Sequence, residues 1–261
     1  MLLQAKNVSL AYGSVEIVKD VNIEINKGDI VTLIGPNGSG KSTILKSLCR
    51  YLKPKVGEVI IEGVNINKIN TKKVAKKIAI LPQTRNIIND YSIETLVGFG
   101  RFPHIGFGKK LKAKDYEVIN WALAKTGLTH MKNRSVKTLS GGERQRAFIA
   151  MALAQKTEIL ILDEPTTFLD ISYQLEVLEL VKEINETLGL TIIMVLHDLN
   201  LAARYSHKIY AIKDGKVFKH GITRDLISKD TLKEVFKVEA EIYEDHHNDC
   251  PYFIPQRVFN E

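Results

Sequence analysis

The 261-residue chain is poor in cysteine and has no long uninterrupted apolar segment. Its two cysteines, Cys49 and Cys250, exclude the dense disulfide framework of small secreted domains. Apolar runs such as residues 191–196 are far shorter than the roughly 20 residues of a membrane-spanning helix. The N-terminal residues lack a basic stretch followed by a long apolar run, so we expect no signal peptide. Together these absences favour a globular protein of the cytoplasm.

Positive charge is in modest excess, with a net charge of +7. Such an excess can serve nucleic acid or an anionic membrane surface. The lysines are scattered, however, and form only short clusters at 71–77 and 108–114. Solvated helix faces explain this pattern better than a nucleic-acid interface does, and we expect no nucleic-acid partner.

Strand and helix patterns alternate along most of the chain and predict an α/β fold. Near-continuous apolar runs are typical of buried parallel strands, and the segments between them are typical of covering helices. A block at 86–154 contains helical patterns and loops and interrupts this alternation. The predicted strands are 29–35, 77–83, 158–164 and 190–198, with an Asp-Gly hairpin at 208–221. The predicted helices are 41–52, 113–127, 141–155, 171–189 and 199–206.

The stretch GPNGSGKS at 35–42 matches the spacing G-x-x-x-x-G-K-[ST] between a predicted strand and a predicted helix. Glycines let backbone N–H groups converge on phosphate oxygens, and the helix N-terminus adds a positive dipole end. In this context Lys41 can reach the β- and γ-phosphates, Ser42 can ligate Mg²⁺, and Thr43 can bind another phosphate oxygen. The sequence therefore predicts a loop that binds the phosphates of ATP.

A site for ATP hydrolysis also needs an acidic group for the metal and a group that orients water. Asp163 ends an apolar strand and can hold the Mg²⁺ shell, and the following Glu164 can polarise the attacking water. Gln83 can sense Mg²⁺ or water through its amide, and His197 can contact the γ-phosphate and hold Glu164 in place. We therefore expect catalytic roles for Glu164, His197 and Gln83, and metal-binding roles for Ser42, Gln83 and Asp163. A lone His at a strand end is usually structural and a lone Gln usually lies on the surface, so the roles of His197 and Gln83 depend on the ordered set of motifs given below.

A second loop with a serine and two glycines, LSGGERQ, lies at 139–145. Ser140 and the N–H groups of Gly141 and Gly142 begin a predicted helix and so form a second anion site. One chain cannot enclose the same γ-phosphate from both sides, so the second loop serves another chain. Ser140 with Glu143 also matches a capping box, and the two roles can hold at once.

The ordered set of the phosphate loop, Gln83, LSGGERQ, ILILDE and His197 resembles the nucleotide-binding subunit of ABC transporters over essentially the whole chain. The resemblance implies a P-loop NTPase core with a mostly parallel sheet, an N-terminal antiparallel β-subdomain and an inserted helical subdomain. The whole of 1–261 would be one ABC ATPase domain. Its core and β-subdomain would occupy 1–85 and 155–261, and the helical subdomain 86–154.

In proteins of this family two subunits pack head to tail with ATP between them. The resemblance implies that the loop at 139–145 closes over ATP held by the 35–43 loop of a second copy. Asp170 would end a loop that couples the two sites, in which Phe168 replaces a more usual small residue. Tyr12 would stack on adenine, although a simple strand-end tyrosine explains it equally well. The implied nucleotide contacts are Tyr12, Gly35, Pro36, Asn37, Gly38, Ser39, Gly40, Lys41, Ser42, Thr43, Ser140, Gly141, Gly142, Glu143 and Asp170.

The segments 100–107 and 197–217 resemble importer subunits for ferric siderophores, haem and cobalamin. The resemblance implies an ATPase that drives import of an iron chelate, or of a related haem or cobalamin ligand, through two polytopic permease subunits. An extracytoplasmic substrate-binding protein would supply the ligand, and the chain would lie peripherally on the cytoplasmic face of the cell membrane. Arg101 and His104 would be placed to contact the permease, although a generic proline-containing loop is another interpretation.

Two other functions stay open at this point. A soluble ABC ATPase that acts on nucleic acid or ribosomes usually carries two cassettes or a long coiled-coil insertion, whereas this chain has one cassette and a short helical insert. An exporter ATPase is disfavoured by the segment 100–107. The tail at 244–250 contains Asp, His and Cys residues, but their spacing fits no standard zinc site, so we expect a polar tail.

Overall fold

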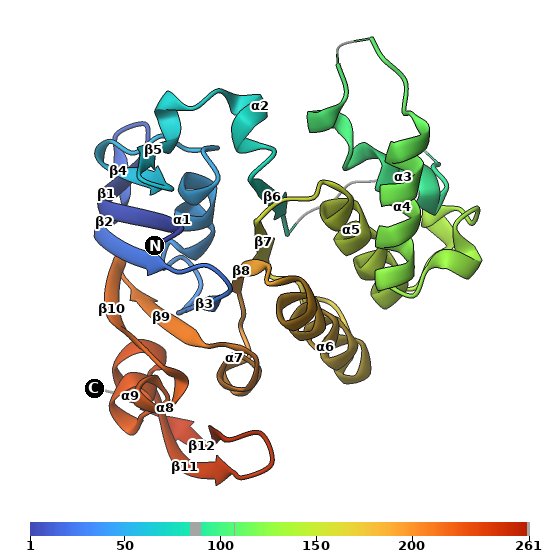
Figure 1. Ribbon diagram of the computed structural model, residues 1–261. Coiled ribbons are helices and arrows are strands. Elements are labelled where there is room, and N and C mark those ends of the chain that lie inside the picture. The colour runs from blue at the N-terminus through green and yellow to red at the C-terminus, as the bar shows by residue number, and fades with distance from the viewer. Residues whose placement is uncertain (84–89, 107, 260–261) are drawn as a thin grey trace. The chain divides into compact units, whose positions relative to one another are not determined.

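The computed structural model describes residues 1–83, 90–106 and 108–259 (Figure 1). The chain divides into two compact units, residues 1–69 with 191–261, and residues 70–190. Both units contain strands and helices, so the predicted α/β class is confirmed. No helix in the described ranges combines the length and the apolar character needed to cross a membrane.

An antiparallel sheet forms the beginning of the first unit, in the strand order β2-β1-β4-β5. Alternate apolar residues of β1 and β2 meet across it, and the side chains of the paired Leu3 and Ile25 are buried, as are those of Ala5 and Ile23. The predicted N-terminal antiparallel β-subdomain is thus confirmed. Its strands are β1 (Leu3–Tyr12), β2 (Val15–Ile25), β4 (Val56–Ile61) and β5 (Val64–Asn65), followed by a 3₁₀ helix at Ile66–Lys68.

Parallel strands form the centre of the first unit. β3 (Ile30–Ile34) lies between β8 (Thr191–Val195) and β9 (Lys208–Lys213) and is parallel to both. Every residue of β3 and β8 is buried, which explains their nearly continuous apolar sequences. β10 (Lys216–Gly221) returns antiparallel to β9 through Asp214 and Gly215, whose φ values of 49° and 75° suit the predicted hairpin turn.

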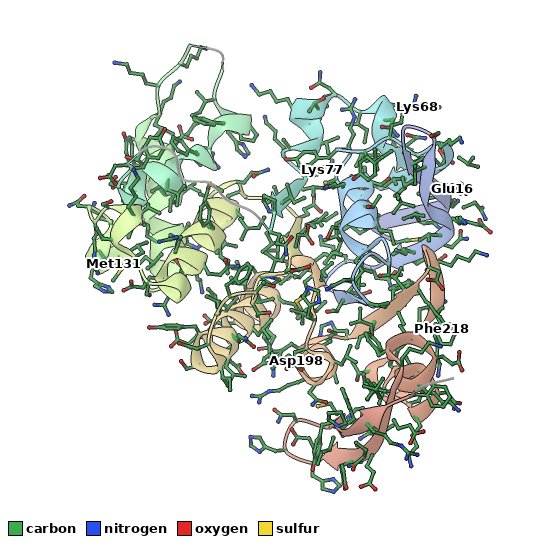
Figure 2. All side chains as sticks on the ribbon, turned by 180° about the vertical axis from the view of Figure 1, so that it is seen from behind. Glu16, Lys68, Lys77, Met131, Asp198 and Phe218 are labelled. Atoms are coloured by element: carbon green, nitrogen blue, oxygen red, sulfur yellow. The ribbon has the colours of Figure 1, made fainter. Side chains whose placement is uncertain are left out.

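Two helices of the first unit follow these parallel strands. α1 (Lys41–Leu48) comes after β3 and packs on β1, burying Ile44 and Leu45. α7 (Leu199–Tyr205) comes after β8. Its N-cap is Asp198, labelled in Figure 2, whose carboxylate accepts a hydrogen bond from the N–H of Leu201 at 2.9 Å. Each helix therefore begins just beyond the carboxyl end of a parallel strand, which is where α/β proteins bind ligands.

The C-terminal segment is an ordered hairpin, and the polar residues at 244–250 form its turn and the adjoining strand ends. β11 (Val238–Asp245) pairs antiparallel with β12 (Cys250–Val258), and residues 244–250 include the turn between them. Asp245 stabilises this turn by accepting hydrogen bonds from the N–H groups of His247 and Asn248. Within the described ranges no cluster of His, Cys, Asp and Glu is placed to hold a metal ion. Two helices precede the hairpin, α8 (Thr223–Leu226) and α9 (Lys229–Phe236).

The second unit combines two parallel strands with a group of helices (Figure 1). β6 (Ile78–Leu81) pairs in parallel with β7 (Ile159–Asp163). α5 (Gly141–Ala154) packs against α3, α4 and α6, and most of its residues after the first turn are buried. The other helices are α2 (Thr71–Val74), α3 (Ile93–Phe99), α4 (Ala113–Lys125) and α6 (Ile171–Leu188), with 3₁₀ helices at Phe102–His104, Thr129–Met131 and Val136–Thr138.

Local capping signals mark several helix ends of the second unit. Ser92 accepts a hydrogen bond from the N–H of Thr95 at the start of α3. Gly189 ends α6 with a φ of 62°, a conformation that glycine adopts without steric cost. The division into a core and a separate helical subdomain at 86–154 stays a prediction.

Candidate functional site

The phosphate loop lies between β3 and α1, as the sequence predicts. Its shape depends on glycine. Gly38 and Gly40 have φ values of 78° and 102°, which side chains with a Cβ adopt only with strain. A Cβ on Gly35 would lie 2.1 Å from the carbonyl oxygen of Ile212. Gly40 is the N-cap of α1 and offers no side chain to the helix, so the loop backbone itself faces any anion bound there.

Polar groups inside this loop fit a bound phosphate. The Lys41 side chain is buried, and its ammonium donates hydrogen bonds of 2.9 Å to the carbonyl oxygens of Gly35 and Pro36. The hydroxyl of Ser39 is buried and has no hydrogen-bond partner in the parts of the chain that the structure describes. A buried donor without an acceptor is costly, and a phosphate oxygen would satisfy it. The residues of the loop therefore fit the triphosphate of a nucleotide.

Tyr12 ends β1 beside this loop. Its ring is 46% exposed, and its hydroxyl lies 3.5 Å from the ammonium of Lys46 on α1. An exposed ring next to the helix that follows the phosphate loop is available to stack on a base. The stacking role of Tyr12 stays a prediction.

The acidic half of the expected site lies in the second unit. Asp163 is the last residue of β7 and is buried. Glu164 follows with a positive φ of 52°, which turns its side chain away from the direction of the strand. The Glu164 carboxylate accepts hydrogen bonds from the amide of Gln83 at 2.5 Å and from the hydroxyl of Thr167 at 3.0 Å. Two residues predicted to be catalytic, Gln83 and Glu164, are thus in direct contact.

Thr167 was missed by the sequence reasoning. Its hydroxyl bonds the same Glu164 oxygen that Gln83 bonds, so it helps to orient the carboxylate. Its position three residues after Glu164 could have indicated this contact, because residues three apart in a turn lie close together. His197 lies in the first unit, exposed at the bend that follows β8. Its predicted contact with Glu164 stays a prediction.

The signature loop, residues 139–143, begins α5. The Ser140 hydroxyl accepts a hydrogen bond from the N–H of Glu143 at 3.3 Å, and the Glu143 carboxylate accepts one from the N–H of Ser140 at 2.8 Å. The predicted capping box is confirmed. The N–H of Ser140, followed by the Ser140 hydroxyl and the Arg134 guanidinium, lowers the pKa of Glu143 despite partial burial of its side chain.

The two glycines of the signature loop are explained by packing. A Cβ on Gly142 would lie 2.3 Å from the ring of Tyr173, and a Cβ on Gly141 would lie 3.0 Å from Leu169. Asp170 caps α6, accepting hydrogen bonds from the N–H of Tyr173 and the hydroxyl of Ser172. The signature loop and the segment that ends at Asp170 therefore pack against each other within the second unit.

Phe168 is the most exposed large apolar side chain of this region. It is 97% exposed, and its backbone has a φ of 65°, an uncommon conformation for a bulky residue. Ile171, close to it in sequence, is 77% exposed. Leu169 lies between these two residues in sequence and is the residue that a Cβ on Gly141 of the signature loop would meet.

The expectation that Arg101 contacts a partner is wrong, because Arg101 is buried. Its guanidinium forms an ion pair with Asp115 at 3.1 Å and donates to the carbonyl oxygen of Ala154 at 2.8 Å. The N–H of Lys112, followed by the Arg101 guanidinium, lowers the pKa of Asp115. Burial lowers the pKa of His104, whose Nε2 lies 2.7 Å from the carbonyl oxygen of Gln155. Phe102, in contrast, is 62% exposed.

Comparisons with known proteins point to one family. A family model described as ABC transporter matches residues 18–167. Over 250 residues the chain is 49% identical to the iron(3+)-hydroxamate import ATP-binding protein FhuC of Bacillus subtilis, covering 95% of this chain and 93% of that relative.

Two solved structures share the fold. One, described as an ABC transporter of the metal-chelate type in an inward-facing conformation, matches with a TM-score of 0.86 at 29% identity, covering 98% of this chain and 97% of the other. The second is the dimeric post-hydrolysis state of an ATP-binding cassette bound to ADP and Pi. It matches with a TM-score of 0.74 at 31% identity, covering 85% of this chain and 99% of the other.

Proposed function

The chain belongs to the ATP-binding subunits of ABC transporters, which are ATPases that power transport, and from this premise we propose that it drives import of a ferric chelate. One observation carries the chemistry. The Glu164 carboxylate is held by both Gln83 and Thr167 directly after the strand that carries Asp163. Two donors to one carboxylate oxygen hold the Glu164 side chain in one orientation, and we assign the carboxylate to positioning the attacking water.

In this proposal the phosphate loop binds the triphosphate of ATP. Lys41 neutralises charge on the β- and γ-phosphates. The buried Ser39 hydroxyl, which finds no partner within the described ranges, donates to a phosphate oxygen. The oxygen donors of Ser42, Gln83 and Asp163 suit Mg²⁺, which supplies further neutralisation of the phosphate charge when bound. His197 contacts the γ-phosphate, and Tyr12 stacks on the adenine.

A second copy of the chain completes the site. We assign Ser140, Gly141, Gly142 and Glu143 to the ATP held by the phosphate loop of the partner copy, with Asp170 linking the two sites. The dimeric cassette bound to ADP and Pi supports this arrangement. The exposed Phe168 and Ile171 support it too, because they lie in the segment next to the signature loop. Closing the dimer on ATP and reopening it after hydrolysis would supply the motion for transport.

We infer the transported ligand and the membrane partners of this chain from the names of its relatives. The Bacillus subtilis relative is named for iron(3+)-hydroxamate import, and a structural neighbour is described as metal-chelate type. We assign to this chain two polytopic permease subunits, a substrate-binding protein outside the cell, and a peripheral position on the cytoplasmic face of the membrane. Haem and cobalamin are the related ligand classes within this proposal. The segment 100–106, with its exposed Phe102, is the surface we assign to the permease.

The first test is affinity purification of the chain from its native membranes, with mass spectrometry of the associated proteins. We expect a polytopic membrane protein and a substrate-binding protein, which is then titrated with ferric siderophores, haem and cobalamin. A polytopic protein alone would favour an exporter. Ribosomal proteins or nucleic acid without a membrane partner would contradict a transporter.

The second test is Glu164→Gln. It should still bind ATP but lose turnover by on the order of 100-fold or more, since it removes the group that orients water, and it should accumulate as an ATP-bound dimer. Size-exclusion chromatography with ATP measures the dimer. Glu179→Gln on α6 serves as the matched control. Turnover at the wild-type rate would assign the role to another residue.

A further inference from the structure

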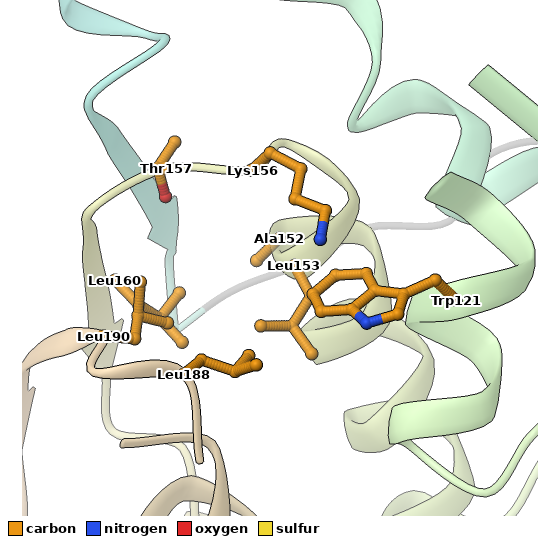
Figure 3. Close-up of a pocket in the computed structure, with 8 residues that line it drawn as sticks. All are labelled: Trp121, Ala152, Leu153, Lys156, Thr157, Leu160, Leu188 and Leu190. Carbon is orange, nitrogen blue, oxygen red and sulfur yellow. The ribbon is translucent and has the colours of Figure 1, made fainter. Parts of the chain in front are cut away.

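An apolar pocket lies in the second unit, away from every residue assigned above (Figure 3). Its volume is about 230 Å³. Side chains from α4, from the end of α5 and the residues after it, from β7, and from the end of α6 and the residues after it line the pocket. The aliphatic wall consists of Ala152, Leu153, Leu160, Leu188 and Leu190.

The side chain of Lys156 lies beside this apolar wall. Lys156 follows the C-cap of α5 with a φ of 53°, and its N–H bonds the carbonyl oxygen of Leu153 at 2.9 Å, so its backbone is fixed at the helix end. Its ammonium lies 3.0 Å from the centre of the Trp121 ring. Figure 3 shows the lysine side chain reaching toward the indole from the opposite wall of the pocket.

The Lys156 ammonium has no carboxylate partner among the residues that the structure describes. No ion pair joins it to an acidic side chain in the part of the chain that the structure describes. Burial, followed by the charge of Arg101, lowers the pKa of Lys156, and no described carboxylate offsets these effects. The indole face attracts the cation but carries no net charge to neutralise it. An anion would be stabilised at this point, and a second cation would be repelled.

The size of the pocket limits the ligand. An apolar cavity of about 150 Å³ holds a benzene molecule, so about 230 Å³ suits a ligand of about nine or ten non-hydrogen atoms. The leucine wall requires most of these atoms to be apolar, and the ammonium requires an anionic end. We propose that this pocket binds a small apolar monocarboxylate, with its hydrocarbon part on the leucine wall and its carboxylate on Lys156.

The test uses the tryptophan as a built-in probe. Trp121 is the single tryptophan of the chain, so its fluorescence reports this pocket in the unmodified full-length protein. We expect a saturable change in emission on titration with sodium octanoate. The alcohol 1-octanol should bind about 3- to 10-fold more weakly, because it lacks the charge that Lys156 recognises. A purely apolar pocket would prefer the alcohol, and equal or tighter binding of octanol would overturn the proposal.

A pair of lysine variants gives the second readout. Lys156→Gln should lower octanoate affinity about 3- to 10-fold in isothermal titration calorimetry and leave octanol affinity unchanged. Lys182→Gln, an exposed lysine on α6, is the matched control and should bind octanoate like the wild type. Unchanged octanoate affinity in Lys156→Gln would contradict the proposal. All measurements are made without ATP, so their outcome does not depend on the function proposed above.

Discussion

Two glycine-containing loops each lead into a helix, and they use glycine for different physical reasons. In the phosphate loop the backbone requires it, because Gly38 and Gly40 have positive φ values and a Cβ on Gly35 would meet a carbonyl oxygen. In the signature loop Gly141 and Gly142 are the first residues of a regular helix. There the absence of a side chain lets Leu169 and Tyr173 approach. In the phosphate loop glycine permits the backbone conformation, and in the signature loop it leaves space for a neighbouring segment.

The two helix starts differ in the same way. Gly40 caps α1 without a side chain, so the phosphate loop presents its backbone to a ligand. The start of α5 is already stabilised by the reciprocal hydrogen bonds of Ser140 and Glu143. The signature loop is therefore stabilised by its own chain without a ligand. This agrees with the proposal that it contacts ATP only in a dimer.

The largest effect expected from this comparison is that of Gly35→Ala. The added Cβ would clash with the backbone carbonyl oxygen of Ile212, which cannot rotate away as a side chain can. ATP affinity should fall by roughly 100-fold or more, since this corresponds to about 3 kcal/mol of lost phosphate contacts. Calorimetric titration with ATP measures the affinity. Gly63→Ala is the control, because a Cβ there meets nothing within 4 Å and tests only the strain of a positive φ. ATP affinity close to that of the wild type would contradict the steric requirement for glycine at position 35.

Gly142→Ala should destabilise the protein by about 1–3 kcal/mol, because its Cβ overlaps the Tyr173 ring. The obstacle is here a side chain, so Tyr173→Ala in the same chain should restore part of the loss. A double-mutant cycle from urea unfolding measures the coupling between the two positions. Additive effects of the two substitutions would show that Gly142 is required for another reason.

Ser140→Ala should cost about 1 kcal/mol, the usual contribution of a helix N-cap. Ser92→Ala at the start of α3 removes an equivalent hydrogen bond and is its matched control. Chemical denaturation measures both, and ATP binding to the monomer should be unchanged in each. Ser140→Arg should in addition block hydrolysis while leaving monomer binding intact. A loss of monomer binding would contradict the head-to-tail arrangement.

The smallest effect concerns pH. Because the folded state lowers the pKa of Glu143, its carboxylate stabilises the protein above the unfolded pKa of about 4.3, and this stabilisation is lost as pH falls through the folded pKa. Glu143→Gln should therefore be less stable than the wild type at pH 7, with the difference shrinking below about pH 4. Urea unfolding at several pH values measures it, with the exposed Glu186→Gln as control. A difference that is the same at all pH values would contradict the role of the Glu143 charge.

Features that depend on neighbouring residues were readable from the sequence. The phosphate loop lies between the predicted strand and helix, the Asp-Gly turn joins β9 to β10, and Ser140 and Gly189 mark helix ends. Each rests on a hydrogen bond or a backbone angle within a few residues of chain, so residue type and spacing suffice to predict it.

Features that depend on distant residues were decided by tertiary structure. The sequence showed no reason for Arg101 to be buried, because its partners Asp115 and Ala154 come from other helices. The same holds for the contact of Gln83 with Glu164 and for the pairing of β11 with β12, which turned an expected tail into a hairpin. By itself the sequence determined the chemistry that the chain carries. Packing between distant segments decided which of those groups face one another. The burial of a charge such as Arg101, or the contact of a ring such as Tyr173, cannot be predicted from the residues next to it in sequence.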